Sequence, residues 1–280
     1  MSNNEIFRLD KLSLFSRKTT TIPESIVELT NLKQINFYGP FSLPKNITSL
    51  PLKSFRLSCN NFIDLPDLNS DSLTDLYLSC NKLTSVKGIE KFKNLEALYL
   101  NNNLLTSLEE IAELVNLKVL QIVGNKLTSI RGIENLVNLE NICLDYNQLT
   151  SLEGIEKLIN LKILHLEANH LTSLEGIENL TNLEELHIYN NQITSLNGTE
   201  NLVNLRTFNF HNNKLQSIPL HIINSPKFND QTQSVLKTLV MTNSVIIKLA
   251  TDNFDFSEEL DRNKRKDPAP GRTTLKSVEF

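Results

Sequence analysis

Residues 171–186 read LTSLEGIENLTNLEEL, and residues 127–142 read LTSIRGIENLVNLENI. Both stretches belong to a frame, Leu-x-x-Leu-x-Leu-x-x-Asn-x-Leu, that returns every 22 residues through most of the chain. A fixed period of this length predicts one elongated solenoid, in which each coil packs against its neighbours along the chain. The frame begins at ten leucines, which are Leu9, Leu32, Leu52, Leu73, Leu95, Leu117, Leu139, Leu161, Leu183 and Leu205.

The frame divides each repeat into a strand and a turn region. Its fourth and sixth positions, such as Leu76 and Leu78, alternate with polar neighbours, as in a short strand with one buried face. The remaining half of each repeat is too short and too interrupted for a long helix. The predicted fold is therefore an α/β solenoid, a horseshoe of about ten repeats with a parallel β-sheet on its concave face and short 3₁₀ or turn segments on its convex face.

Two further rows of residues recur with the same period. We interpret the Asn row as structural, because its amides can satisfy backbone groups in the turn that leaves each strand, and an unpaired buried group costs about 1–3 kcal/mol. Gly recurs after that turn, where a positive φ angle or a close approach of adjacent coils favours it, although Glu110 replaces it in one repeat. The rows are Asn81, Asn103, Asn125, Asn147, Asn169, Asn191 and Asn213, and Gly88, Gly132, Gly154, Gly176 and Gly198.

The pattern predicts four segments along the chain. Residues 1–8 are an N-terminal flank. Residues 9–227 form the solenoid, and its first two repeats are degenerate and act as an N-terminal cap. Residues 228–250 carry apolar side chains outside the frame and are predicted to form a C-terminal cap. Residues 251–280 are polar and charged, which predicts a mobile tail.

Composition narrows the class of function. The net charge of −4 provides no global basic surface, so we expect no nucleic-acid partner. No apolar run of about 18 residues occurs, and the first residues lack a basic start followed by an apolar stretch, so we expect neither a membrane span nor a secretion leader. Three cysteines are too few for disulfide-dense caps. We therefore expect a monomeric protein of the cytoplasm, with the nucleus as an alternative.

Residues 73–215, with the copies quoted above, resemble the 22-residue leucine-rich repeats of the SDS22 type. The resemblance implies a non-catalytic binding protein, because SDS22-like proteins are binders and their founding member is a regulatory subunit of protein phosphatase 1 that engages its partner through the concave face. The repeats are also similar to those of bacterial internalins and of effector proteins injected into a host cell. That similarity implies a host protein as partner and the host cytosol as location.

The variable positions of the frame predict where a partner binds. Side chains at the third, fifth, seventh and eighth positions face the concave surface, and all five tyrosines of the chain fall there. Tyrosine offers a rigid contact with a polar tip and is enriched at binding hot spots, although tyrosines also suit strands and stack in ladders. The predicted partner-binding residues are Tyr77, Tyr99, Gln121, Asp145, Tyr146, His165, Glu167, His187, Tyr189 and His211.

Three other chemistries are weaker hypotheses. His165 and His187 share a phase in adjacent repeats and could share a metal, but no third ligand follows from spacing alone, so we predict no metal and no cofactor. Cys143 neighbours His165 as in a nucleophilic dyad, but nothing in the sequence resembles an oxyanion hole, so we predict no enzyme. Cys59 and Cys80 share the eighth position of adjacent repeats, and free thiols are favoured over a disulfide.

The tail contains two short motifs. Lys276, Val278 and Phe280 resemble the basic-x-Val-x-Phe docking motif through which many partners bind protein phosphatase 1. Residues 262–266 are a basic cluster that could be an address, although a solvated run is the favoured interpretation. The leading hypothesis is a protein–protein interaction module with its site on the concave face. The alternatives are a regulatory subunit of a protein phosphatase 1-type enzyme and a bacterial effector acting on a host protein.

Overall fold

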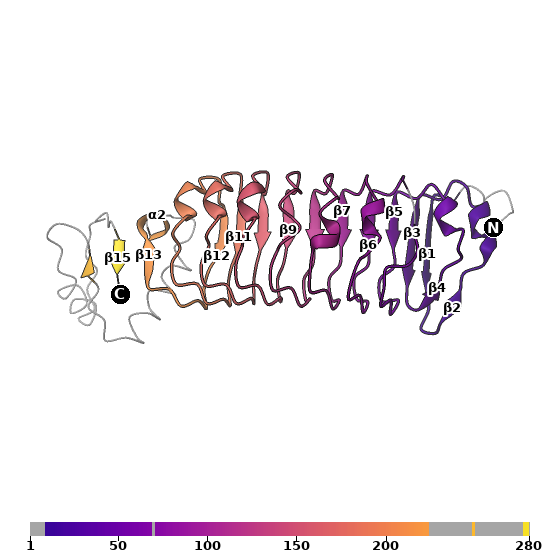
Figure 1. Ribbon diagram of the computed structural model, residues 1–280, viewed down its shortest axis with the longest axis horizontal. Coiled ribbons are helices and arrows are strands. Elements are labelled where there is room, and N and C mark those ends of the chain that lie inside the picture. The colour runs from indigo at the N-terminus through magenta and orange to yellow at the C-terminus, as the bar shows by residue number, and fades with distance from the viewer. Residues whose placement is uncertain (1–8, 69–70, 224–247, 250–276, 280) are drawn as a thin grey trace, which may run out of the picture.

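The computed structural model describes residues 9–68, 71–223, 248–249 and 277–279. Within these ranges the chain forms coils stacked side by side, with β1 and β13 at opposite ends of the stack (Figure 1). The predicted flank at residues 1–8 lies outside the described residues. So do the basic cluster at residues 262–266 and most of the predicted cap and tail.

One long parallel sheet organises the described chain and confirms the predicted solenoid. Its ten strands follow the chain in order, each hydrogen-bonded to the next, and equivalent frame positions pair, as in Leu76 with Leu98 and Leu98 with Leu120. The strands are β1 (Lys11–Phe15), β3 (Gln34–Tyr38), β5 (Ser54–Arg56), β6 (Asp75–Tyr77), β7 (Ala97–Tyr99), β8 (Val119–Gln121), β9 (Asn141–Cys143), β10 (Ile163–His165), β11 (Glu185–His187) and β12 (Thr207–Asn209).

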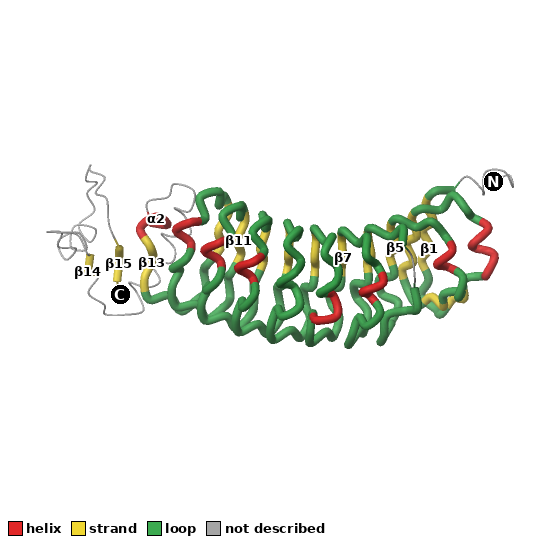
Figure 2. Tube along the Cα trace, turned by 45° about the horizontal axis from the view of Figure 1, so that its top comes forward, coloured by secondary structure: helices red, strands yellow, loops and turns green. Residues whose placement is uncertain are grey.

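Short 3₁₀ helices lie across the coils from the sheet, as expected for the convex side (Figure 2). They are η1 (Glu24–Glu28), η2 (Ile47–Ser49), η3 (Ile89–Lys91), η4 (Glu109–Ile111), η5 (Ile155–Lys157), η6 (Ile177–Asn179) and η7 (Thr199–Asn201). No helix among the described residues is long and apolar enough to cross a membrane.

Smaller elements lie at both ends of the sheet. Near the first coils, β2 (Thr20–Thr21) pairs in parallel with β4 (Phe41–Ser42). After the last coil come β13 (Ser217–Pro219) and α2 (Leu220–Ile223). A three-stranded antiparallel sheet contains β13, β14 (Lys248–Leu249) and β15 (Ser277–Glu279). The middle strand is β15, which pairs with β13 on one side and with β14 on the other. Three residues of the predicted tail are therefore in a strand.

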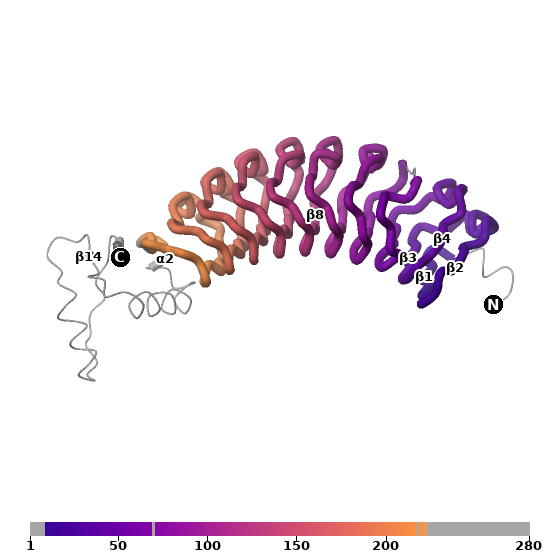
Figure 3. The backbone as a smooth tube through the Cα atoms, turned by 60° about the horizontal axis from the view of Figure 1, so that its bottom comes forward, coloured from indigo at the N-terminus to yellow at the C-terminus, as the bar shows by residue number. Residues whose placement is uncertain are grey.

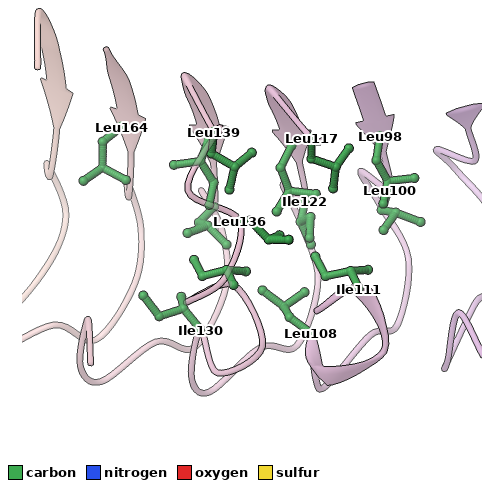
Figure 4. Close-up of a cluster of buried hydrophobic side chains, with 14 of the residues drawn as sticks. Leu98, Leu100, Leu108, Ile111, Leu117, Ile122, Ile130, Leu136, Leu139 and Leu164 are labelled. Atoms are coloured by element: carbon green, nitrogen blue, oxygen red, sulfur yellow. The ribbon is translucent and has the colours of Figure 1, made fainter. Parts of the chain in front are cut away.

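The core is a continuous apolar layer between the sheet and the convex segments. Leu98 and Leu117 enter this layer from the strand side and Leu108, Ile111 and Ile130 from the convex side, and each is at most 1% exposed (Figure 4). Full burial of such a side chain stabilises the fold by about 1.5–3 kcal/mol. Because the layer runs through neighbouring coils, each coil needs its neighbours to bury these side chains, and the stack is cooperative along its length.

The Asn row has the structural role predicted for it. The side chain of Asn147 accepts a hydrogen bond from the Leu127 amide (3.1 Å) and donates to the carbonyls of Ile122 (2.9 Å) and Leu144 (3.0 Å). Asn60 extends the same row by one coil and is also buried. Each of these Asn side chains thus joins one coil to the preceding one through hydrogen bonds to buried backbone groups.

Two further ladders were not predicted from the sequence. One is an outer Asn row, in which Asn138 donates to the carbonyl of Val115 (2.9 Å) and Asn160 donates to that of Val137 (2.8 Å). The other explains the recurring Gly-x-Glu motif, because the Gly154 amide donates to a carboxylate oxygen of Glu156 (2.9 Å) at the entrance of η5. Each convex turn that begins with a glycine therefore carries its own acceptor two residues later.

From β3 to β12, the eighth frame position turns the chain out of each strand. Its backbone is left-handed, with a positive φ angle, in a conformation that Gly and Asn adopt most readily. Repetition of this turn in successive coils accompanies the smooth arc of the stack in Figure 3. The residues are Gly39, Cys59, Cys80, Asn102, Gly124, Tyr146, Ala168, Asn190 and Asn212.

Candidate interaction surface on the concave face

The predicted partner-binding residues lie on the concave face of the long sheet, which points away from the core, or at the ends of its strands. The parallel register places Tyr77 beside Tyr99 and His165 beside His187. Tyr146 is exposed, at 57%, and the other nine residues are half-buried. The side chains of the concave surface are thus partly covered by contacts with one another.

An aromatic patch, defined here as Arg56, Tyr77 and Tyr99, covers β5 to β7. The two tyrosine rings stack with centroids 4.3 Å apart at 6°. The Arg56 guanidinium carbon lies 4.1 Å from the centroid of the Tyr77 ring, and Arg56 donates to the Tyr38 hydroxyl (2.9 Å). Burial, followed by the neighbouring Tyr77, raises the pKa of Tyr99. The patch is a rigid stack with a cation at one end.

A histidine patch, defined here as Cys143, His165, Glu167, Glu185 and His187, covers β9 to β11. The two imidazoles stack with centroids 4.3 Å apart at 4°. Glu185 Oε1 lies 3.0 Å from His165 Nε2 and 3.1 Å from His187 Nε2, and Glu167 Oε1 lies 3.1 Å from His187 Nδ1. Glu185 therefore hydrogen-bonds His165 and lies close to Nε2 of His187, and Glu167 hydrogen-bonds the other nitrogen of His187.

Cys143 is not activated as a nucleophile. Its sulfur lies 3.5 Å from His165 Nδ1 and accepts a hydrogen bond from Gln121 (3.1 Å). Burial is the main cause that raises the pKa of this thiol to about 11. A nucleophilic cysteine needs the opposite shift, toward the thiolate. The geometry of a dyad is present, but its electrostatics oppose catalysis.

Asp145 and Tyr146 differ in what they do. Asp145 Oδ1 accepts a hydrogen bond from the Glu167 amide (2.7 Å), so this carboxylate also fastens the next coil, and burial raises its pKa. Tyr146 projects from a left-handed residue and hydrogen-bonds the Tyr189 hydroxyl, which raises the pKa of Tyr189. The Tyr189 ring in turn packs against His211, with centroids 4.7 Å apart.

Three residues of the surface were not among the predicted site residues. Arg56, Cys143 and Glu185 all occupy frame positions that face the concave side. The prediction was based on the positions of the tyrosines and on the frame position that the histidines share, so it did not include these three residues. Glu185 lies at the third position, two residues before His187, and the period-two alternation of a strand brings it to the same face. That alternation was the signal that could have identified it.

The remaining sequence hypotheses concern thiols and the tail. Cys59 and Cys80 are free thiols, and burial together with the neighbouring Cys80 raises the pKa of Cys59. Of the predicted docking motif, Val278 is in β15, and Lys276 and Phe280 lie outside the described residues. The docking role of this motif stays a prediction.

The fold and repeats match known proteins. The family model described as leucine-rich repeats (2 copies) matches more than half of the chain, at residues 71–113, 115–157, 137–180, 159–202 and 181–221. A crystal structure of an internalin (inlF) from Listeria monocytogenes is similar at a TM-score of 0.59 and 21% identity, over 76% of this chain and 76% of that chain. An internalin C2 (inlC2) from the same species is similar at 0.56 and 29% identity, over 72% and 80%. No curated protein matches the chain.

Proposed function

The chain belongs to the leucine-rich-repeat family, and we propose that it is a non-catalytic interaction module whose concave face binds one protein partner. Repeat proteins of this kind use the extended concave surface for binding. The observation that carries the proposal is the stacked aromatic patch: two tyrosines and an arginine are held in place before any partner arrives.

Preorganisation is the physical reason to place the site there. Immobilising a flexible side chain on binding costs about 0.5–1.5 kcal/mol. Tyr77 and Tyr99 are already fixed by stacking, and Arg56 is fixed over Tyr77 and by the Tyr38 hydroxyl. A partner that covers this patch therefore loses less entropy than on a surface of free side chains, and Tyr and Arg are the residue types enriched at hot spots.

The test compares two double variants of the purified chain. Tyr77→Ala with Tyr99→Ala removes the patch, and Val115→Ala with Val203→Ala, at residues 47% and 76% exposed away from the strands, is the matched control. Proteins captured by the wild type and the control but lost by the first variant are purified, and their affinities are measured by calorimetry. We expect the tyrosine variant to bind at least about 30-fold more weakly, a loss of about 2 kcal/mol as at a hot spot.

Circular dichroism establishes that both double variants are folded before the comparison. If the tyrosine variant binds every captured partner as tightly as the control does, the site is not on the aromatic patch. If only the control variant loses binding, the interaction face is elsewhere on the solenoid.

Regulation of a protein phosphatase 1-type enzyme is one specific form of this function. It is supported by the 22-residue repeat class. The Val278 segment is extended but pairs with β13 and β14 on its two edges, so docking as an added strand requires it to leave this sheet. The test is co-elution of the full chain with a purified phosphatase catalytic subunit, with the tyrosine double variant in parallel. Separate elution of wild type and phosphatase at micromolar concentration would rule this form out.

Action as a bacterial effector on a host protein is a second specific form. It is supported by the similarity to two Listeria monocytogenes internalins. Delivery is tested by removing residues 251–280 and following transfer of the chain into host cells. Undiminished delivery of the shortened chain would contradict a secretion role for the tail.

A further inference from the structure

Three metal-ligand side chains converge in the histidine patch. His165 ends β10, and Glu185 and His187 lie two residues apart on β11. Each offers one ligand atom, and these atoms all lie within 4.8 Å of one another. The repeat spacing brings the two histidines together but identifies no third ligand, so no metal site was expected from the sequence. Glu185 supplies that third ligand from the same face of the sheet.

The hydrogen bonds of His187 determine the state of its second nitrogen. Nδ1 is hydrogen-bonded to Glu167 Oε1 at 3.1 Å, and because a carboxylate accepts, this nitrogen carries the proton. Nε2 is buried and has no hydrogen-bond partner, although Glu185 Oε1 is only 3.1 Å away. In the neutral imidazole, Nε2 then presents a lone pair to a carboxylate oxygen, and the two repel. A cation between them turns this repulsion into attraction.

From this geometry we propose that His165, Glu185 and His187 bind one divalent transition-metal ion of the Zn²⁺ type. The ion is coordinated by both Nε2 atoms and by a carboxylate oxygen, and the proton that His165 Nε2 shares with Glu185 Oε1 in the free protein moves to Nδ1, which faces the Cys143 sulfur at 3.5 Å. This site goes beyond the proposed interaction function. Ligands about 2.0–2.2 Å from a tetrahedral zinc ion lie about 3.3 Å from one another. The distances of 3.0 and 3.1 Å from Glu185 Oε1 to the two nitrogens are close to that value.

The surroundings fit the ion in two further ways. Glu167, hydrogen-bonded to the other nitrogen of His187, is the outer carboxylate that commonly orients a metal-binding histidine. The side chains of His165, His187 and Glu185 are 22%, 20% and 32% exposed, so an ion from solvent can reach them. Because the two rings are parallel, they must tilt for their lone pairs to converge on one ion.

Three protein ligands leave the fourth position of a tetrahedral ion open. Because these side chains are on the concave face, that position opens toward the surface proposed for the partner. A water molecule fills it in the free protein, and a carboxylate or imidazole of a partner can replace that water.

The test measures Zn²⁺ binding to the full chain, without a polyhistidine tag, by calorimetric titration with zinc chloride in the presence of a competing chelator. We expect one ion per chain with micromolar or tighter affinity and a rise of the unfolding temperature on Zn²⁺ addition. His165→Asn and Glu185→Gln each weaken binding at least about 100-fold, and Glu167→Gln weakens it about 10–100-fold. His170→Asn, at an exposed histidine outside the proposed sites, serves as the matched control and binds like the wild type.

Co²⁺ in place of Zn²⁺ adds a readout of the ligands, because a coordinating thiolate produces an intense charge-transfer band and nitrogen and oxygen ligands do not. We expect no such band and unchanged Zn²⁺ affinity in Cys143→Ser. Wild type without stoichiometric binding, ligand variants that bind like the wild type, or an equal loss in His170→Asn would each overturn the proposal. Loss of binding in Cys143→Ser would overturn the ligand set. Glu185→Gln is nearly isosteric, so it keeps the test valid if His165→Asn fails to fold.

Discussion

At the residue scale, the buried side chain of Asn147 hydrogen-bonds the Leu127 amide and the carbonyls of Ile122, Leu144 and Asp145, and its removal should be costly. Asn147→Ala leaves the Leu127 amide without its partner, whereas the Leu144 and Ile122 carbonyls keep the neighbouring Asn side chains of the row as donors. An unsatisfied buried amide costs about 1–3 kcal/mol and each other lost hydrogen bond about 0.5–1.5 kcal/mol, so we expect a loss of at least about 2 kcal/mol in the free energy of unfolding. Urea unfolding measures it.

The matched control for Asn147→Ala is Asn138→Ala, which removes one hydrogen bond from the exposed outer row. Water can replace that bond, so we expect a loss of about 0.5–1.5 kcal/mol. Equal losses in the two variants would contradict the assignment of the buried row as the stronger coupling between coils.

Tyr146 has a strained backbone and an exposed side chain, so one substitution there should change the free energy of unfolding and the partner affinity in opposite directions. Its φ of 54° places a bulky residue in the left-handed region, at a cost of about 1–2 kcal/mol. Tyr146→Asn should relieve part of that cost, raise the free energy of unfolding by about 0.5–1 kcal/mol, and weaken partner binding. Ala168→Asn, at a φ of 51°, should stabilise the chain to a similar degree without affecting binding. Unchanged affinity in Tyr146→Asn would remove Tyr146 from the site.

At the element scale, the glycines that begin the convex turns are required for two different reasons. A Cβ at Gly132 would lie 2.4 Å from the Leu108 carbonyl oxygen, whereas at Gly88 the nearest atom, on Leu65, is 4.0 Å away. Gly88→Ala should therefore cost only the positive-φ strain, about 1–3 kcal/mol. Gly132→Ala must also displace backbone, and we expect its loss in chemical denaturation to exceed that of Gly88→Ala by at least about 1 kcal/mol. Similar losses would show that the coils move apart freely.

One repeat has no glycine at the start of its convex turn. Where Glu110 replaces it, η4 starts from Leu108 at a φ of −115° instead of from a left-handed residue. Glu110 reaches back to the preceding coil, where its carboxylate accepts hydrogen bonds from Ser85 and from the Val86 amide. The sequence predicted the glycine row but not this substitute, because an acidic residue at a single position has no period.

The coil next to α2 should respond to pH through His221. Burial lowers the pKa of this imidazole, and its Nε2 lies 2.9 Å from the Thr199 hydroxyl, which itself donates to the Leu196 carbonyl. A lowered pKa means that the unfolded chain takes up the proton first, so stability is complete above about pH 6.5 and decreases as the pH falls below it.

We therefore expect the stability lost by the wild type between pH 7.5 and pH 5.5 to be greater than that lost by His221→Gln, measured as the shift of the unfolding temperature. His170→Gln is the control, because His170 is exposed. A variant at His221 with the same pH dependence as the wild type would contradict a buried neutral imidazole.

Across the elements, the roles of residues that repeat with the 22-residue period could be predicted from the sequence, and the contacts of residues that do not repeat could not. Leu76, Leu98 and Asn147 repeat in phase, so their strand, core and ladder roles were evident from the sequence. The contacts of the candidate site are aperiodic: Arg56 over Tyr77, or Glu185 between two imidazoles, depends on which side chains happen to meet across adjacent strands. Spacing identified the face, but only the register and the rotamers identify the pairs.

At the scale of the whole molecule, a stack with contacts mainly between neighbours should lose stability locally rather than everywhere. Leu120, on the central strand β8, and Phe208, on β12 near the end of the sheet, are both 0% exposed. Large-to-small changes at such positions cost about 2–5 kcal/mol. In a one-dimensional stack the consequence depends on place, because a central coil connects two halves and a terminal coil connects one.

Leu120→Ala should lower the denaturation midpoint and broaden the transition, because it weakens the contacts of β8 with both β7 and β9 and uncouples the two halves. Phe208→Ala should raise hydrogen exchange in the coils from β11 to β13 while strands β3 to β8 keep wild-type protection, because the terminal coils can open without the rest. Hydrogen exchange with mass spectrometry on both variants measures this directly. If Phe208→Ala reduces protection equally in every strand, the solenoid unfolds as a single two-state unit, and the neighbour-by-neighbour account of its stability is wrong.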